Sequence, residues 1–191
     1  MSNFLVETSA RHVHLTRDAV ETLFGKGYAL TNKKDLSQPG QFACEEKVTV
    51  IGPKGSLKAS ILGPERPANQ VELSLTDART IGLAGVPVRE SGDIAGSAPI
   101  TIVGPKGIVT LKEGCIIANR HIHMSLDEAK AFGVSDGEYA DVELNGERRT
   151  LFYDVQIRAH KDFRLEMHID TDDANAAGVG NGFKAKLIKR K

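Results

Sequence analysis

The sequence predicts a mainly β fold made of two similar halves, each a small barrel or sandwich. Three observations support this prediction: a histidine motif that occurs twice, many short runs of alternating apolar and polar residues, and strong turn signals between those runs. The motif is Arg-His-φ-His-φ, where φ is an apolar residue, and it spans residues 11–15 and 120–124. Its recurrence indicates an internal duplication.

Each motif is expected to lie on a strand that leads into a short helix. After the first motif, Thr16 is suited to N-cap a helix that ends at Gly25. After the second, Ser125 and Glu128 fit a capping box, and that helix ends at Gly133. Both halves therefore begin with the same order of elements.

Most of the remaining chain is expected to form hairpins. The predicted strands and turns are residues 48–62 turning at 52–55, residues 100–111 turning at 104–107, residues 140–158 turning at Asn145-Gly146, and a last strand over 183–188. In addition, residues 71–78 match the opening of residues 165–174, which makes Glu166 the counterpart of Glu72 and His168 the counterpart of Ser74. The first half has extra residues before this segment, and we place them in a polar loop over 27–46.

Length and composition limit the classes of protein that the chain can represent. With 191 residues it can form two small domains, which we place at 11–117, including loop 27–46, and at 118–191. Lys and Arg balance Asp and Glu at 25 each, which argues against a dedicated nucleic-acid binder. We see no membrane span and no signal peptide, so we expect a cytoplasmic protein in which Cys44 and Cys115 are free thiols.

The duplicated motif is typical of a metal site. Histidines at i and i+2 of a strand face the same side, and imidazole is the commonest metal ligand in proteins. His168 and Glu72 lie on later predicted strands and extend the set of donors. The candidate ligands are His12, His14, Glu72, His121, His123 and His168, and they suit two zinc ions or similar divalent metals with open positions.

Other interpretations of these residues stay open. The motif could be a packing device whose imidazoles donate to backbone carbonyls. Glu72 could be a surface or ion-paired carboxylate, and Glu166 is expected to be solvated. His160 stands in a polar turn and is interpreted as exposed and without function.

Arg66 is the candidate anion-binding residue. It lies between Pro64 and Pro67, which would hold the backbone steady, and its guanidinium can bind phosphate or carboxylate bidentately. A surface arginine in a proline-rich loop is the alternative. We find no nucleophile elbow and no base paired with Cys44 or Cys115, so the sequence gives little support for a covalent nucleophile.

Several segments also carry a resemblance to a known family: residues 9–15, 38–42, 61–64, 70–74, 91–93, 120–124 and 165–170. In content and order they resemble the phosphate propanoyltransferases, the propanediol-utilisation type of phosphotransacylase, over nearly the whole chain. The resemblance implies two β-barrels capped by short α-helices, with the N-terminal strand, 1–10, completing the C-terminal barrel. It also implies a dinuclear, zinc-type site between them, at which the six candidate ligands match the ligand positions and Arg66 matches the phosphate-binding arginine.

The activity implied by this resemblance is transfer of a propanoyl or acetyl group between coenzyme A and inorganic phosphate, without an acyl-enzyme. Expected partners are acyl-CoA, phosphate and a second copy of the chain in a homodimer. Ser9, Lys33, Lys34 and Arg79 are candidate coenzyme A contacts, or else ordinary surface residues. Members packaged in bacterial microcompartments often have an N-terminal extension. The first motif segment here starts at Ser9, so we expect a cytosolic role or packaging in the microcompartment lumen by another route. The rival functions are a dinuclear metallohydrolase and a non-catalytic zinc-binding module.

Overall fold

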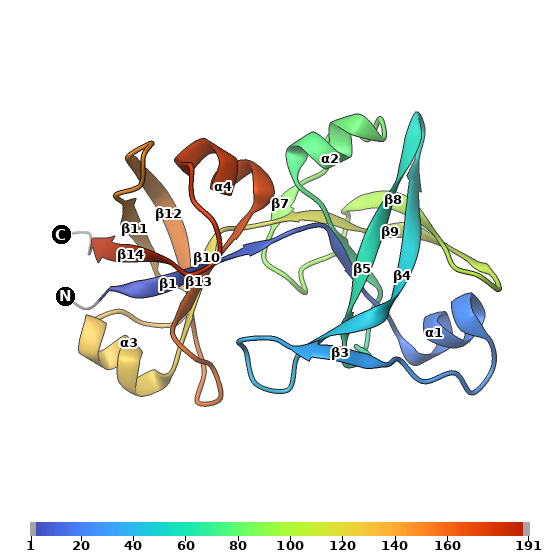
Figure 1. Cartoon of the computed structure of the whole chain (residues 1–191), viewed down its shortest axis with the longest axis horizontal. Helices are drawn as coiled ribbons and strands as arrows, with labels where there is room; N and C mark the ends of the chain where they lie inside the picture. Colours follow the sequence, from blue (N-terminus) through green and yellow to red (C-terminus); the bar gives the residue numbers. More distant parts are fainter. Residues whose placement is uncertain (1–2, 189–191) are drawn as a thin grey trace. The chain divides into compact units, whose positions relative to one another are not determined.

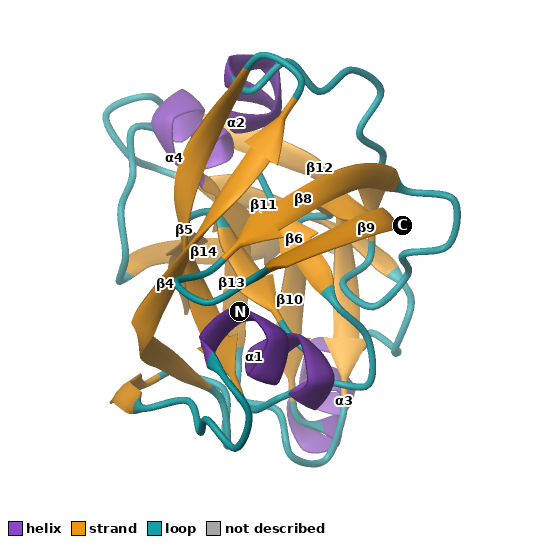
Figure 2. Cartoon of the chain, turned by 90° about the vertical axis from the view of Figure 1, so that its right-hand side faces the viewer, coloured by secondary structure: helices purple, strands orange, loops and turns teal. Residues whose placement is uncertain are grey.

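The computed structural model describes residues 3–188 and shows a molecule of many strands and a few short helices (Figures 1 and 2). The strands are β1 (Phe4–Ser9), β2 (His12–His14), β3 (Asn32–Asp35), β4 (Phe42–Gly52), β5 (Gly55–Gly63), β6 (Gln70–Glu72), β7 (Val88–Arg89), β8 (Ala98–Val103), β9 (Ile108–Ala118), β10 (His121–Met124), β11 (Tyr139–Leu144), β12 (Thr150–Ala159), β13 (Glu166–Asp170) and β14 (Phe183–Ile188). The helices are α1 (Arg17–Phe24), α2 (Leu75–Thr80), α3 (Leu126–Phe132) and α4 (Thr171–Ala177). Among residues 3–188, none of the helices is both long and apolar enough to cross a membrane.

The chain forms two compact units. One, here called the N-terminal barrel, consists of Ala10–Leu36 and Gly40–Ala118. The other, the C-terminal barrel, contains, of the described residues, 3–9, the short segment Ser37–Pro39 and 119–188.

Each unit is a closed six-stranded barrel with the same strand pattern. In the N-terminal barrel the order is β4-β5-β2-β6-β9-β8 and back to β4, with β3 beside β4 and β7 beside β9. In the C-terminal barrel it is β1-β13-β10-β12-β11-β14. β2 is parallel to β5 and antiparallel to β6, and β10 is likewise parallel to β12 and antiparallel to β13. The predicted fold class, a duplicated β-barrel with short helices, is confirmed.

The two barrels exchange one strand each. β1 leads directly into β2 along the chain, yet it pairs with β13 and β14 in the C-terminal barrel. β9 leads directly into β10, yet it pairs with β6 and β8 in the N-terminal barrel. Each barrel is thus completed by the strand that precedes the histidine motif of the other.

The apolar residues of the motifs belong to the two hydrophobic cores. Val13 and Leu15 are buried in the core of the N-terminal barrel, and Ile122 and Met124 in that of the C-terminal barrel. Because successive side chains of a strand point to opposite faces, burial of these residues turns the histidines between them to the other face. The alternation in the motif therefore fixes both the core and the site.

The helix starts follow from their capping residues. Thr16 and Ser125 cap α1 and α3 as predicted, and Ser125 and Glu128 form the predicted capping box. α2 and α4 were not predicted, because the alternating residues before them were interpreted as one continuous strand segment. Ser74 and Asp170 start these helices, since their side chains accept hydrogen bonds from the backbone N–H of the third helical residue.

The predicted hairpins are all present. β4–β5, β8–β9 and β11–β12 turn at the expected glycine-containing segments, and β14 spans 183–188. Part of the stretch placed in loop 27–46 is ordered as β3, which pairs with the start of β4.

Candidate metal and phosphate site

The first cluster consists of His12, His14 and Glu72 in the N-terminal barrel. The two histidines lie on β2, and Glu72 lies opposite His12 on the antiparallel strand β6. His12 Nε2 is 3.3 Å from Glu72 Oε2, and His14 Nε2 is 3.6 Å from Glu72 Oε1. All three side chains are buried, so their donor atoms face one another away from bulk water.

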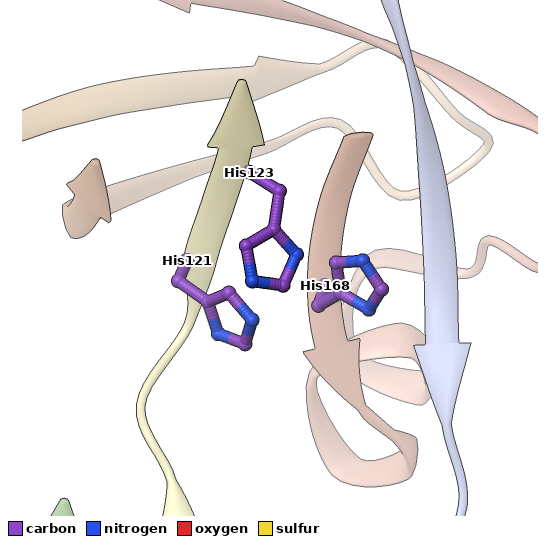
Figure 3. A group of neighbouring side chains, drawn as sticks. All are labelled: His121, His123 and His168. Carbon is purple, nitrogen blue, oxygen red and sulfur yellow. The ribbon is translucent and has the colours of Figure 1, made fainter. Parts of the chain in front are cut away.

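The second cluster consists of His121, His123 and His168 in the C-terminal barrel. The first two come from β10 and the third from the neighbouring strand β13, and Figure 3 shows the three rings gathered in one place. The ring centroid of His123 is 4.6 Å from that of His121 and 4.8 Å from that of His168. In each cluster one donor atom per residue can be chosen so that all three lie within 4.8 Å of one another.

The strand register corrects the predicted equivalence of the two halves. His12 pairs with Glu72 across β2 and β6, and His121 pairs with His168 across β10 and β13. Glu72 and His168 therefore hold equivalent positions, and the interpretation of Glu166 as the counterpart of Glu72 was wrong. The alignment of the two halves in the sequence was therefore shifted by two residues. A shift of two is hard to detect in a strand, because residues two apart lie on the same face.

Backbone carbonyls orient the rings of the first cluster and one ring of the second. His12 Nδ1 lies 2.9 Å from the carbonyl oxygen of Ala10, and His121 Nδ1 lies 2.8 Å from that of Asn119. A carbonyl oxygen can only accept, so these contacts require a proton on Nδ1 and leave the lone pair on Nε2. The packing role considered for the motif and a metal-binding role are thus compatible in the same residue.

The donor set fits a divalent metal ion. Bonds of about 2.0–2.1 Å to nitrogen or oxygen place neighbouring ligand atoms of a tetrahedral zinc site about 3.3 Å apart. The separation of His12 Nε2 and Glu72 Oε2 is 3.3 Å. Three imidazoles, or two imidazoles and a carboxylate, leave a fourth position open, as in catalytic zinc sites.

Electrostatics in the first cluster favour a cation. Burial raises the pKa of Glu72, but the neighbouring imidazoles outweigh burial and hold that pKa well below its usual range. Burial lowers the pKa of His12, but Glu72 and the Ala10 carbonyl raise it above its ordinary value. Burial lowers the pKa of His14 to about 4, so His14 is neutral at pH 7 and ready to act as a ligand.

Arg66 lies beside the first cluster. Its positive charge helps to lower the pKa of His14 and partly offsets the rise in the pKa of His12, and its Nη1 is 3.5 Å from Ser91 Oγ. Its backbone N–H donates to the carbonyl of Leu15, at the end of the motif, at 2.8 Å. The segment that carries the arginine is therefore fastened to the strand that carries the histidines.

Glu166 is not solvated as expected. Its side chain is 12% exposed, and its Oε2 lies 3.5 Å from His168 Nε2. Burial, with repulsion from Glu7 as a further cause, raises the pKa of Glu166 to about 7. Glu7 in turn accepts a hydrogen bond of 2.7 Å from the Ser37 hydroxyl.

The remaining candidates lie on other elements than the six candidate ligands. Lys33 and Lys34 are exposed on β3, where Lys33 Nζ lies 3.7 Å from Glu45 Oε2. Arg79 is exposed on α2, and Ser9 ends β1. His160 is exposed, as predicted.

Both cysteines are free and buried, as expected. Burial raises the pKa of Cys44 to about 11 and that of Cys115 to about 12. Neither thiol has the lowered pKa of an activated nucleophile.

Two polar residues of the site, one buried and one half-buried, were not predicted. Gln70 Nε2 donates to Glu72 Oε1 at 2.6 Å, and the Ser91 hydroxyl donates to the same oxygen at 2.8 Å. The signal available in the sequence was the spacing of Gln70 and Glu72, which puts a polar neighbour on the same face of a short strand as the ligand.

Comparison with known proteins gives one consistent result. Residues 5–180 match the family model described as phosphate propanoyltransferase. Similar curated proteins of that name include one from Lachnoclostridium phytofermentans, 58% identical over 93% of this chain and 83% of the relative. Others are from Thermotoga maritima, 51% identical over 97% of this chain and 89% of the relative, and from Clostridioides difficile, 50% identical over 97% and 88%.

Proposed function

Because the chain belongs to the phosphate propanoyltransferase family and is therefore an acyltransferase, we propose that it moves a short acyl group between coenzyme A and inorganic phosphate with the help of two divalent metal ions. Each histidine cluster would hold one ion. Zinc is the metal that three neutral imidazoles, or two imidazoles and a carboxylate, suit best.

The observation that carries the proposal is the position of Arg66 beside the first cluster. A divalent metal and a guanidinium next to each other form a site for a doubly charged oxyanion, and inorganic phosphate is the family's substrate of that kind. Arg66 would bind two phosphate oxygens and hold a third towards the thioester.

The bond changes follow from the substrates. A phosphate oxygen adds to the thioester carbonyl carbon, and the carbon–sulfur bond breaks as coenzyme A leaves as a thiolate. When bound, the metal ions supply positive charge that stabilises the phosphate and the developing oxyanion. Direct attack by phosphate needs no acyl-enzyme, in keeping with the raised pKa of both buried thiols.

For coenzyme A we propose Ser9, Lys33, Lys34 and Arg79 as contacts, since three of them carry positive charge for its phosphates. The pair of Lys33 with Glu45 is exposed on both sides, so phosphate can displace the glutamate at little cost.

The test is the dependence of thiol release on phosphate. With propanoyl-CoA or acetyl-CoA as substrate, free thiol should appear only when phosphate is present, together with an equal amount of acyl phosphate. Release without phosphate would show a metallohydrolase, and bound zinc without any release would show a binding module. Either result overturns the proposal.

A further inference from the structure

We propose that Gln70 and Ser91 are positioning residues that fix the Glu72 carboxylate for its metal and tie that carboxylate to Arg66. This inference rests on the proposed metal and phosphate sites and adds two residues that neither site includes. Both residues belong to the N-terminal barrel, as do the groups that they contact.

Gln70 is held in one orientation. Its Oε1 accepts a 2.8 Å hydrogen bond from the backbone N–H of Gly92, so its Nε2 must be the end that faces Glu72. That Nε2 donates to Glu72 Oε1 at 2.6 Å and to Ser91 Oγ at 2.9 Å, which uses both of its protons. The side chain is only 3% exposed, so water cannot easily replace these partners.

Ser91 connects the carboxylate with the arginine. Its oxygen contacts Gln70 Nε2, Arg66 Nη1 and Glu72 Oε1, and of these three only the carboxylate oxygen can accept. The hydroxyl proton therefore points to Glu72 at 2.8 Å, and the lone pairs of the hydroxyl face the two donors. One serine thus holds the groups proposed to bind metal and phosphate in a fixed relationship.

These contacts give the two oxygens of the Glu72 carboxylate different roles. Oε1 receives both hydrogen bonds, whereas Oε2 lies 3.3 Å from His12 Nε2, the spacing that suits two ligands of one metal. Rotation of the buried carboxylate would break two short hydrogen bonds. Oε2 is therefore already oriented towards the metal position before the metal binds.

The other barrel gives independent support. Glu166 stands on β13 where Gln70 stands on β6, opposite His123 and His14 respectively. A carboxylate ligand needs a hydrogen-bond donor beside it, and an imidazole ligand needs an acceptor. Gln70 donates to Glu72 at 2.6 Å, and the Glu166 carboxylate lies 3.5 Å from the His168 ring, so neighbours of opposite kinds stand at equivalent positions.

The experiment measures metal affinity in the full chain with only the first cluster intact. A His121→Ala/His168→Ala background removes the second cluster, and Gln70→Met, Ser91→Ala and Ser91→Thr are added to it separately. Cobalt(II) absorption and zinc competition with a chelator then report the coordination and affinity of one site. Ser97→Ala is the control, because Ser97 is buried and its hydroxyl, among residues 3–188, hydrogen-bonds with the Ile94 carbonyl and the Gly114 N–H and not with the site.

We expect Gln70→Met and Ser91→Ala to weaken zinc binding about 10–100-fold and to alter the cobalt spectrum. Ser91→Thr, which keeps the hydroxyl, should stay within about threefold, as should Ser97→Ala. With both clusters intact, Ser91→Ala should raise the KM for phosphate more than the KM for acyl-CoA. Melting in the presence of chelator separates loss of folding from loss of affinity.

Two results would overturn the inference in different ways. If the background protein binds metal and the Gln70 and Ser91 variants bind it equally well, the positioning role alone is wrong. If the wild-type chain binds no metal at either cluster, the proposed metal sites and this inference fall together.

Discussion

Arg11 Nη1 donates a 2.8 Å hydrogen bond to Asp77 Oδ1, and this ion pair joins the histidine motif to helix α2. Arg120 makes the corresponding contact with Asp173 of helix α4 at 3.1 Å. Both aspartates are the third residue after the helix N-cap. The arginine that opens each motif is therefore explained by structure: it ties the ligand-bearing strand to the helix after the third ligand.

Arg11→Ala should destabilise the metal-free protein by about 1–3 kcal/mol, because it leaves the mostly buried Asp77 carboxylate without its cation. Urea unfolding in the presence of a chelator measures the change. Arg89→Ala is the matched control, since the Arg89–Asp93 pair is exposed and should contribute less than about 1 kcal/mol. Equal losses in the two variants would contradict the role given to Arg11.

Each of the two clusters should account for one bound metal ion. We expect two zinc ions per wild-type chain and one in either Glu72→Ala or His168→Ala, because each variant removes one of three ligands from a single cluster. Elemental analysis after dialysis gives the stoichiometry. His160→Ala should retain both ions, since this exposed histidine stands outside the clusters. Loss of metal from His160→Ala would mean that the ligand assignment is incorrect.

Arg66→Ala should keep its metal but lose at least about 100-fold in phosphate-dependent turnover, the usual effect of deleting a group that stabilises developing charge. Steady-state kinetics at varied phosphate, combined with metal analysis, tests this. Arg66→Lys should recover only part of the activity, because an ammonium group cannot bind two oxygens in a fork. Near-normal turnover in Arg66→Ala would remove Arg66 from the phosphate site.

The two thiols should be inert in the folded protein. With a pKa of about 11 for Cys44 and about 12 for Cys115, on the order of one thiol in a thousand or fewer is ionised at pH 8. Iodoacetamide at pH 8 should label neither cysteine before denaturation and both after it, as mass spectrometry would show. Rapid labelling of native Cys44, or an acylated cysteine trapped during turnover, would refute direct attack by phosphate.

The sequence was sufficient for the fold wherever the signal was local. Thr16, Ser125 and Asn145-Gly146 each specify a cap or a turn through their own backbone preferences, and the structure has those elements there. α2 and α4 were missed because the strands before them share their alternating pattern with the first residues of the helix. Ser74 and Asp170 decide the boundary, and they do so through hydrogen bonds that periodicity does not reveal.

The candidate site was predictable to the level of residue type and spacing. A pair of histidines on one strand predicts two neighbouring imidazoles, and the ring centroids of His12 and His14 are indeed 4.9 Å apart. The equivalent residues on the partner strands were harder to predict. A shift of two residues keeps the same face of the strand, so Glu166 was matched with Glu72 although His168 is its counterpart. Ser91 lies far along the chain from Glu72, so only the fold brings its hydroxyl to the carboxylate.

The exchanged strands have a consequence for the order in which the protein can be made. β1 is synthesised before the other described strands, but its partners β13 and β14 are synthesised after them, and Phe4 pairs with Ala185. The N-terminal barrel can close once β9 has emerged, while β1 lacks its partner strands until β13 and β14 have been made. The C-terminal barrel therefore closes only after β14 has been synthesised, and a split of the gene between the two histidine motifs would separate β1 from the barrel that needs it.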